Sequence, residues 1–418
     1  MVHGRSLQRH ASPIRQASLR EHNLALVLRQ IATAGTRSGP ALAGRYPPSR
    51  ADIATATGLT RSTVSALVDD LISGQLVLEV APAPKAGAGR PSVGLALDPR
   101  GPAGLGLEVN VDYLAACVID LSGAVRHREV RHADQRPRTP EQVLATLDEL
   151  AVSATEAATG QHLQLAGIAL AVPGLVQEQT VRLAPNLGWR DIEVPARIGG
   201  IPVTVDNEAN LAALGELLTN PHAGRNFIYV SGEIGIGAGV VLDGEIVAGS
   251  RGFSGEIGHV AVQPNGPACR CGAFGCLEQY AGLEAIIRAA GIASNQDQLP
   301  PEVRTGGAQL DIIAGARAGN RRVLGALDGA GTALGIVLAG MVNFIDVDTV
   351  ILGGIYTQLE PWLRIHIARE LGDRVLAADW APVGIRASVL AEEAAVVGAA
   401  ASVIRTVWDH PAAWIPNR

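Results

Sequence analysis

The 418-residue sequence predicts an α/β protein in which a small helical head precedes two α/β lobes around a cleft. Three observations support this prediction. Two short helical patterns and a hairpin pattern occur near the N-terminus, strands and helices alternate from residue 103 onward, and two series of short strands lie well apart in that region. The predicted domains are residues 1–98 and 99–418, and the second divides into lobe 1, about 99–210 plus the C-terminal helix, and lobe 2, about 211–390.

The head begins with three helical patterns. Apolar residues recur at helical spacing over residues 17–34, and a connector rich in Gly, Pro and Arg follows. Ser49 with Asp52 three positions later is an N-terminal capping pattern for the second helix. Gly58 permits a tight turn, and Thr60 can cap the third helix. Two short helices around such a turn are typical of a helix-turn-helix.

The helix after Thr60 combines a buried face with a polar start. Val64, Leu67 and Leu71 fall on one face, whereas the first turn is polar. The segments "QLVLEV" and "SVGLALD" then read as two strands of a hairpin, and the tip "APAPKAGAGRP" joins them. A hairpin behind a helix-turn-helix is a wing, so the head is predicted to be a winged helix-turn-helix.

Charge is distributed unevenly between the head and the rest of the chain. Residues 1–100 carry 12 Lys and Arg against 6 Asp and Glu, so a whole-chain charge of −6 leaves −12 for the remainder. The head alone is therefore expected to meet a polyanion, with its third helix in the major groove of DNA and its wing along phosphates or in the minor groove. An ordinary three-helix bundle is the alternative. The residues expected at DNA are Arg50, Thr60, Arg61, Ser62, Thr63, Ser65, Lys85 and Arg90.

From residue 103 the sequence becomes rich in strands. The segments "AGLGLEVN", "YLAACVIDLSG" and "AVRHREVRHAD" read as three successive strands with hairpin turns. A helix over 140–158 and the strand "LAGIALAVPGLV" follow. A second series begins at "RNFIYVSGEIGIGAGVVLDGEIVAG", with helices after residue 279. Two strand series separated by helices predict two lobes rather than one continuous sheet.

Three of the four cysteines lie within eight positions and predict a metal site. Cys269, Cys271 and Cys276 follow His259, which lies ten residues before the first of them. Three thiolates and one imidazole form a usual tetrahedral zinc set, and four protein ligands leave no open position, so the zinc is expected to be structural. Three reduced surface thiols are the alternative. Cys117 lies in a strand pattern and is expected in the core.

A second polar cluster lies where a strand is expected to end and a helix to begin. In "VDNEANLAALGE", Asn207 and Glu208 take this position, although Asn207 could equally be a helix cap. Glu256 and Glu278 lie on either side of the predicted zinc loop. Carboxylates and amides in one cleft suit a polyhydroxylated ligand. The glycine-rich segments 231–239 and 350–359 are weak evidence for phosphate binding.

These motifs together resemble the ROK family (repressors, open reading frames and sugar kinases), and within it the DNA-binding branch related to xylose repressors. The resemblance covers nearly the whole chain, and its most specific motifs are "GEIGHV…CRCGAFGCLE", "VDNEANLAALGE" and "APNLGW". It implies an actin-like, ribonuclease H-like bilobal fold with a sugar in the interlobe cleft. The sugar-contacting positions that it implies are Gly174, Asn207, Glu208, Glu256, His259 and Glu278. The zinc ligands that it implies are His259, Cys269, Cys271 and Cys276.

The chain departs from the kinases of this family at three places. Their Asp-x-Gly-Gly-Thr turn falls on residues 108–112, which read Glu-Val-Asn-Val-Asp, and their Gly-Thr-Gly falls on residues 233–235, which read Glu-Ile-Gly. Their catalytic Asp is replaced by Glu208. Added carboxylates repel phosphate, so the chain is expected not to be an enzyme.

The sequence therefore predicts a sugar-responsive DNA-binding regulator, and the resemblance implies that it is a repressor. A homodimer or tetramer would bind an inverted-repeat operator. The effector would be a sugar or an amino sugar. A sugar kinase with a DNA-binding head and a regulator that answers to a protein partner are the alternatives. No signal-like stretch opens the chain, and its longest apolar run, residues 334–345, is too short to span a bilayer, so a cytoplasmic protein without membrane contact is expected.

Overall fold

The computed structural model describes residues 16–36, 47–81, 93–220, 222–292 and 301–416. The chain separates into two compact units. Unit 1 comprises Met1–Gly101 together with Arg405–Arg418, and unit 2 comprises Pro102–Ile404. The predicted wing tip, with Lys85 and Arg90, lies outside the described residues.

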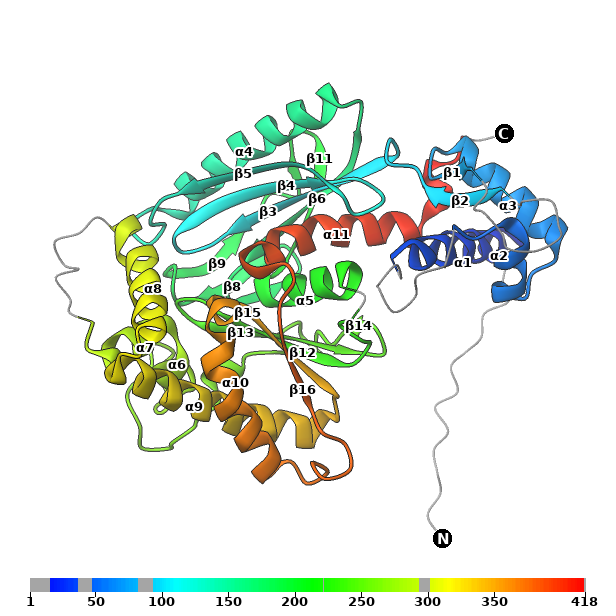
Figure 1. Ribbon diagram of the computed structural model, residues 1–418. Helices are drawn as coiled ribbons and strands as arrows, with labels where there is room; N and C mark the ends of the chain where they lie inside the picture. The colour runs from blue at the N-terminus through cyan, green and yellow to red at the C-terminus, as the bar shows by residue number, and fades with distance from the viewer. Residues whose placement is uncertain (1–15, 37–46, 82–92, 221, 293–300, 417–418) are drawn as a thin grey trace, which may run out of the picture. The chain divides into compact units, whose positions relative to one another are not determined.

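Unit 1 has the elements of a winged helix-turn-helix (Figure 1). They are α1 (Gln16–Thr36), α2 (Arg50–Thr57), α3 (Arg61–Ser73), β1 (Val77–Val80) and β2 (Gly94–Leu97). The two strands pair antiparallel, as the hairpin pattern predicts. Val64, Leu67 and Leu71 of α3 are buried, so the predicted apolar face is confirmed.

Local hydrogen bonds explain where α2 and α3 begin. The Ser49 backbone N–H donates to Asp52 Oδ2 at 2.9 Å, and the Asp52 N–H donates to Ser49 Oγ at 3.3 Å, which is the predicted capping box. Gly58 ends α2 with φ +74°, a conformation that favours glycine. Thr60 caps α3 by accepting from the Thr63 N–H at 3.2 Å.

The C-terminal residues of the chain pack within unit 1. The short helix η5 (Pro411–Trp414) contacts α1, and a Cβ added at Gly74 would lie 2.9 Å from the Trp414 carbonyl oxygen. Arg29 Nε donates to Asp409 Oδ1 at 3.0 Å. The compact units thus divide differently from the predicted domains, which place the whole C-terminal helix in lobe 1, because these contacts tie its last turn to α1.

The first lobe of unit 2 is built on a six-stranded sheet of order β10-β11-β6-β3-β4-β5, with a three-stranded sheet β7-β8-β9 beside it. The helix α4 (Pro140–Gly160) packs on β3, β4, β5 and β6, matching the helix predicted at 140–158. The strands are β3 (Pro102–Val109), β4 (Tyr113–Ile119), β5 (Val125–His132), β6 (Gln164–Val172), β7 (Leu175–Gln177), β8 (Thr180–Ala184), β9 (Trp189–Glu193), β10 (Arg197–Ile198) and β11 (Ile201–Asn207).

The second lobe is built on a five-stranded sheet of order β14-β13-β12-β15-β16 and a group of helices. The strands are β12 (Phe227–Gly232), β13 (Ile236–Leu242), β14 (Glu245–Ile246), β15 (Thr349–Gly354) and β16 (Gly384–Ala387). The helices are η2 (Ile257–His259), α6 (Glu278–Ala281), α7 (Leu283–Ala290), α8 (Pro301–Arg317), α9 (Arg321–Ile345), α10 (Ile355–Arg374) and η4 (Ala391–Glu393).

Two helices lie between the sheets of unit 2 (Figure 1). They are α5 (Glu208–Thr219) and α11 (Ala394–Asp409), and they approach their neighbours at glycines. A Cβ added at Gly106 of β3 would lie 2.1 Å from the Val396 carbonyl oxygen, and one at Gly398 of α11 would lie 1.8 Å from the Leu211 carbonyl oxygen. These close approaches lock α11 between β3 and α5, which is the bilobal α/β arrangement that the resemblance predicts.

One helix of the described residues, α9, is long and apolar enough to cross a membrane by length and composition alone. However, 61% of its most apolar window is buried inside the protein. Its buried residues belong to the core of the second lobe, together with α7 and α10. The apolar character of α9 is therefore typical of a central helix in a folded domain.

Candidate functional site

All six residues predicted to contact a sugar line one cavity in unit 2, which we call the main cavity. The residues of both lobes contribute to its wall. They include Asn110, Gly174, Pro185, Asn186, Asn207, Glu208, Glu233, Gly235, Glu256, His259, Arg270 and Glu278. Of the described residues that line it, half carry polar side chains, and these suit a ligand with many hydroxyl groups.

Gly174 and Asn207 form one hydrogen-bonded corner of the main cavity. Gly174 follows β6 with φ +99°, and a Cβ there would lie 2.2 Å from the Leu183 carbonyl oxygen, so only glycine fits. Asn207 Nδ2 donates to the Gly174 carbonyl oxygen at 2.9 Å, and Asn207 Oδ1 caps α5 by accepting from the Ala209 N–H at 2.8 Å. Asn207 is thus the helix cap that the sequence left open, with one N–H left for a ligand.

Glu208 is the first residue of α5 and is poorly solvated. Its Oε2 atom is buried and has no hydrogen-bond partner among the described residues. Burial raises the pKa of Glu208 well above its ordinary value, and the carboxylates of Glu233 and Glu108 add to the rise. A hydroxyl or amine of a ligand would supply the missing donor.

The second lobe presents two carboxylates and an imidazole. Glu256 precedes the short helix η2, His259 ends it, and Glu278 begins α6. Burial raises the pKa of both carboxyls, whereas His259 lowers it. A Cβ at Gly235 would lie 2.7 Å from Glu278 Oε2, so the glycine lets the β12–β13 turn approach this carboxylate.

The four predicted metal ligands form a compact cluster. A ring nitrogen of His259 and the Sγ atoms of Cys269, Cys271 and Cys276 all lie within 4.8 Å of one another. The Cys271 and Cys276 sulfurs are 3.7 Å apart, and Cys269 Sγ is 3.8 Å from His259 Nδ1. Zinc–sulfur bonds of about 2.3 Å in a tetrahedron place two sulfurs about 3.8 Å apart, so the donor set fits zinc.

The backbone of the cysteine loop brings these ligands together. Gly272 and Gly275 have φ of +93° and +71°, and a Cβ at Gly275 would lie 1.6 Å from the Gln263 carbonyl oxygen. Because the Nδ1 atom of His259 faces the sulfurs, its Nε2 atom is left for the main cavity that His259 also lines. Cys117 is fully buried in β4, as expected for a core residue.

A second, smaller cavity adjoins the main cavity, and we call it the acidic cavity. Both are lined by Asn110, Glu208 and Glu233. Glu108 also lines the acidic cavity, and its Oε1 atom accepts from the Tyr113 hydroxyl at 2.7 Å. Burial raises the pKa of Glu108 to about 7 and that of Glu233 to about 8. The turns at 108–112 and 233–235 thus bring carboxyl groups together in this cavity.

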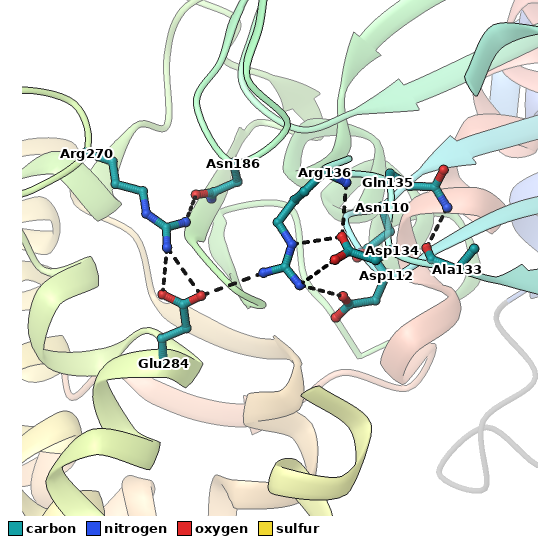
Figure 2. Close-up of polar contacts among 9 residues, drawn as sticks. All are labelled: Asn110, Asp112, Ala133, Asp134, Gln135, Arg136, Asn186, Arg270 and Glu284. Atoms are coloured by element: carbon teal, nitrogen blue, oxygen red, sulfur yellow. Dashed lines mark hydrogen bonds and ion pairs between the residues drawn. The ribbon is translucent and has the colours of Figure 1, made fainter. Parts of the chain in front are cut away.

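The sequence interpretation missed a polar network at the main cavity (Figure 2). Arg270 Nη2 donates to Glu284 Oε2 at 3.1 Å, and Arg270 Nη1 donates to Asn186 Oδ1 at 3.4 Å. Arg136 belongs to the first lobe, and its Nη1 atom lies 3.9 Å from Glu284 Oε1. The Nε atom of Arg136 donates to Asp134 Oδ1 at 2.8 Å. Two of these residues could have been found from the sequence. Arg270 lies between two cysteines of the predicted zinc loop, and Asn186 belongs to the motif "APNLGW".

In unit 1 the described residues among those predicted to contact DNA lie at the start of α3 and at the start of α2. Arg61 and Ser62 are exposed, and Thr63 and Ser65 are partly exposed. The Thr60 hydroxyl bonds to the hydroxyls of Ser62 and Thr63 at 3.0 and 2.8 Å. A further predicted residue, Arg50, is held in ion pairs with Asp69 Oδ1 at 2.6 Å and Glu79 Oε1 at 2.8 Å.

Comparison with known proteins places this architecture in a family. The family model described as ROK family matches residues 104–406. The xylose repressor of Bacillus subtilis (strain 168) is 32% identical over 370 residues, which span 87% of this chain and 92% of that protein. The glucokinase of Streptomyces coelicolor is 32% identical over 320 residues, which span 71% of this chain and 97% of that protein.

Solved structures give the same result. A ROK family transcriptional regulator, a homolog of the E. coli MLC protein, has a TM-score of 0.73 and 26% identity, and the match covers 94% of this chain and 97% of that chain. A ROK family glucokinase from Streptomyces griseus in complex with glucose and AMPPNP has a TM-score of 0.61 and 25% identity, and covers 72% of this chain and 98% of that chain. Since the family model spans most of unit 2, this chain belongs to the ROK family.

Proposed function

We propose that this protein is a sugar-responsive transcriptional repressor that binds operator DNA through unit 1 and its effector in the main cavity. The observation that carries the proposal is the joining of a winged helix-turn-helix to a ROK domain. The similarity to xylose repressors spans 87% of this chain, whereas the similarity to the Streptomyces glucokinase spans 71%. A xylose-like sugar is therefore the first effector to test.

The DNA-binding part of the proposal rests on α3 and the charge of the head. The exposed start of α3 offers a hydroxyl-rich surface and Arg61, which suit phosphate and base contacts. Paired helix-turn-helix units match two-fold symmetric DNA, so a homodimer or tetramer would bind an inverted repeat in the cytoplasm. Arg50 would act by holding α2 near α3 and β1 rather than by contacting DNA, because two acids already neutralise it.

The zinc in this proposal is structural. Four protein ligands leave no open position for water or substrate, so the metal would brace the loop that carries His259 and the flanking Glu256 and Glu278. The His259 imidazole would be fixed by the metal at Nδ1 and would offer Nε2 to a sugar hydroxyl. The effector would then close the lobes and shift the balance between DNA-binding and released states.

An anisotropy titration tests the DNA-binding proposal. The full chain is titrated against labelled DNA from upstream of its own gene, with and without D-xylose, D-glucose and D-glucosamine. We expect specific binding to a palindromic site and a change in affinity with one of the sugars. Binding that is no tighter than to scrambled DNA would contradict the proposal.

The competing function is a sugar kinase with a DNA-binding head. The similarity of this chain to glucokinases supports this alternative. Glu108 and Glu233 disfavour it, because the resemblance puts the kinases' phosphate-binding turns at residues 108–112 and 233–235, where this chain has these acids. A coupled assay of ADP release over the same sugars decides between the two, and we expect no turnover.

A further inference from the structure

The acidic cavity lies between the two lobes of unit 2, and the proposed function gives it no role. Glu108 belongs to β3 of the six-stranded sheet, and Glu233 follows β12 of the five-stranded sheet. Both side chains line the acidic cavity, together with Glu208 at the start of α5. The cavity has a volume of about 10 Å³, which is enough for about one water molecule. Acids from two lobes thus share a space that is too small to hydrate them as ions.

Hydrogen bonds in the acidic cavity do not compensate for this lack of water. Glu108 is 3% exposed, and its Oε1 atom accepts from the Tyr113 hydroxyl at 2.7 Å. Its Oε2 atom is buried with no hydrogen-bond partner among the described residues, and Glu208 Oε2 is buried in the same way. A buried carboxylate needs several donors to stay ionised, so this environment favours the neutral form of each acid.

The ionisable groups that surround Glu108 and Glu233 add little positive charge. Among the described residues, Arg128 is the one cation of this set, and its guanidinium is paired with Glu393. The other groups are acids and tyrosines, which supply no countercharge. The full set is Asp112, Tyr113 of β4, Arg128 of β5, Glu208 of α5, Tyr229 of β12, Tyr356 of α10 and Glu392 of η4.

The two acids lose their protons close to neutral pH. Burial raises the pKa of Glu108 to about 7 and that of Glu233 to about 8, and the charge of Glu108 adds to the rise at Glu233. Below these values the neutral carboxyls can donate and accept hydrogen bonds inside the cavity. Above them, two like charges from opposite lobes repel each other in a space with almost no water. Separation of the lobes would hydrate both acids, so ionisation favours an open arrangement of unit 2.

We propose that Glu108 and Glu233 form a proton-sensitive contact between the lobes, which keeps the lobes together while both acids are neutral and lets them separate when both are ionised. This inference rests on the proposed function in one respect, because residues of the same two lobes line the proposed effector site. Closure around the effector would therefore take up protons, and alkaline pH would weaken effector binding. Operator binding would respond to pH as well as to the sugar.

Small-angle X-ray scattering of the full, zinc-loaded chain without sugar tests the contact itself. We expect the radius of gyration to be larger at pH 9.0 than at pH 6.5, because the lobes separate. The double variant Glu108→Gln with Glu233→Gln is neutral at both pH values and should remove this difference. Glu156→Gln, an exposed change on α4 outside both cavities, should keep it. Thermal unfolding at both pH values checks that each variant is folded. If the double variant does not fold, Glu233→Gln alone should still reduce the difference.

Calorimetric titration tests the link to the effector. D-xylose and D-glucose carry no charge between pH 6.5 and pH 9.0, so a change in their affinity reports on the protein. We expect the Kd of a sugar that binds to rise about tenfold or more over this range, and by less than about threefold in the double variant. At pH 8.0, titrations in two buffers that differ in ionisation enthalpy should show proton uptake by the wild-type chain that the double variant lacks.

A radius of gyration and a Kd that are the same at both pH values would overturn the inference and leave the proposed function standing. So would a pH-dependent change that the folded double variant retains in full. A wild-type chain that expands at pH 9.0 while the double variant does not, yet binds neither sugar, would support the contact and contradict a response to these sugars. The failure of the inference and the failure of the proposed function are therefore distinguishable.

Discussion

The zinc loop, residues 256–278, and the two turns at 108–112 and 233–235 both contribute to the wall of the main cavity, yet they differ in their electrostatics. In the zinc loop every potential ligand of the metal faces the others within 4.8 Å, so its charges have partners once zinc is bound. In the two turns, Glu108 and Glu233 face each other and Glu208 without a basic residue between them. The comparison teaches that one wall gathers its donors around a candidate metal site, whereas the other buries carboxyl groups whose pKa is raised.

Among the variants considered, removal of a buried zinc ligand is expected to lower zinc content and stability the most. Cys276→Ser should lose bound zinc and several kcal/mol of stability, because the loop is folded around the metal. Metal analysis and thermal unfolding measure both. Cys117→Ser is the matched control, since Cys117 is an equally buried cysteine far from the cluster in sequence. A Cys276→Ser protein with full zinc content would contradict the ligand assignment.

Loss of a cavity carboxylate should have the next largest effect. Glu256→Ala is expected to weaken effector binding roughly 10- to 100-fold, because a charge-assisted hydrogen bond contributes about 1.5–3 kcal/mol. Operator binding without the sugar should be unchanged, and Glu156→Ala should change neither property. Anisotropy titrations with and without effector measure the result. If DNA binding were lost instead, Glu256 would be a structural residue.

The two turns should show an unusual dependence of stability on pH. Burial raises the pKa of Glu233 to about 8, so between its ordinary value of 4.5 and 8 the folded protein keeps a proton that the unfolded chain releases. This group therefore destabilises the fold as pH rises through that window. Glu233→Gln should raise the unfolding free energy at pH 8.5 by up to a few kcal/mol and leave it nearly unchanged at pH 4.5. Urea unfolding at the two pH values measures this difference. An equal gain in unfolding free energy at pH 4.5 and pH 8.5 would contradict the prediction.

The polar network at the main cavity is expected to contribute least. Arg136 and Glu284 are partly exposed, and the distance between their charged atoms is 3.9 Å, so this ion pair between the lobes contributes about 0–1 kcal/mol. Arg136→Gln should therefore change effector affinity by no more than about fivefold. Calorimetry at low and high salt checks this, and a larger loss that persists at high salt would show that Arg136 positions the ligand directly.

Local patterns predicted the fold well because they are set by short-range physics. The capping box at Ser49, the turn at Gly58 and the buried face of α3 depend on residues a few positions apart, and the structure confirms all three. The cysteine spacing likewise predicted a compact four-ligand cluster. These features could be predicted without information about segments that are distant in the sequence.

Several features that depend on distant segments were not predicted. The pairing of Arg136 with Glu284 joins residues of different lobes, and the acidic cavity is lined by residues from 108 to 395. Sequence comparison with kinases located the acids at Glu108 and Glu233, but only the fold shows that they share one cavity with Glu208. No local pattern indicated that Asp409 would pair with Arg29.

The packing of Arg405–Arg418 into unit 1 has a practical consequence for anyone who handles this protein. The C-terminus belongs to the same compact body as the helix-turn-helix, although it is more than 300 residues away in the sequence. An affinity tag or fluorescent fusion at the C-terminus is therefore attached to unit 1, and removal of the last turn of α11 would remove a contact with α1. A clone of residues 1–101 alone would likewise be missing a piece of that body.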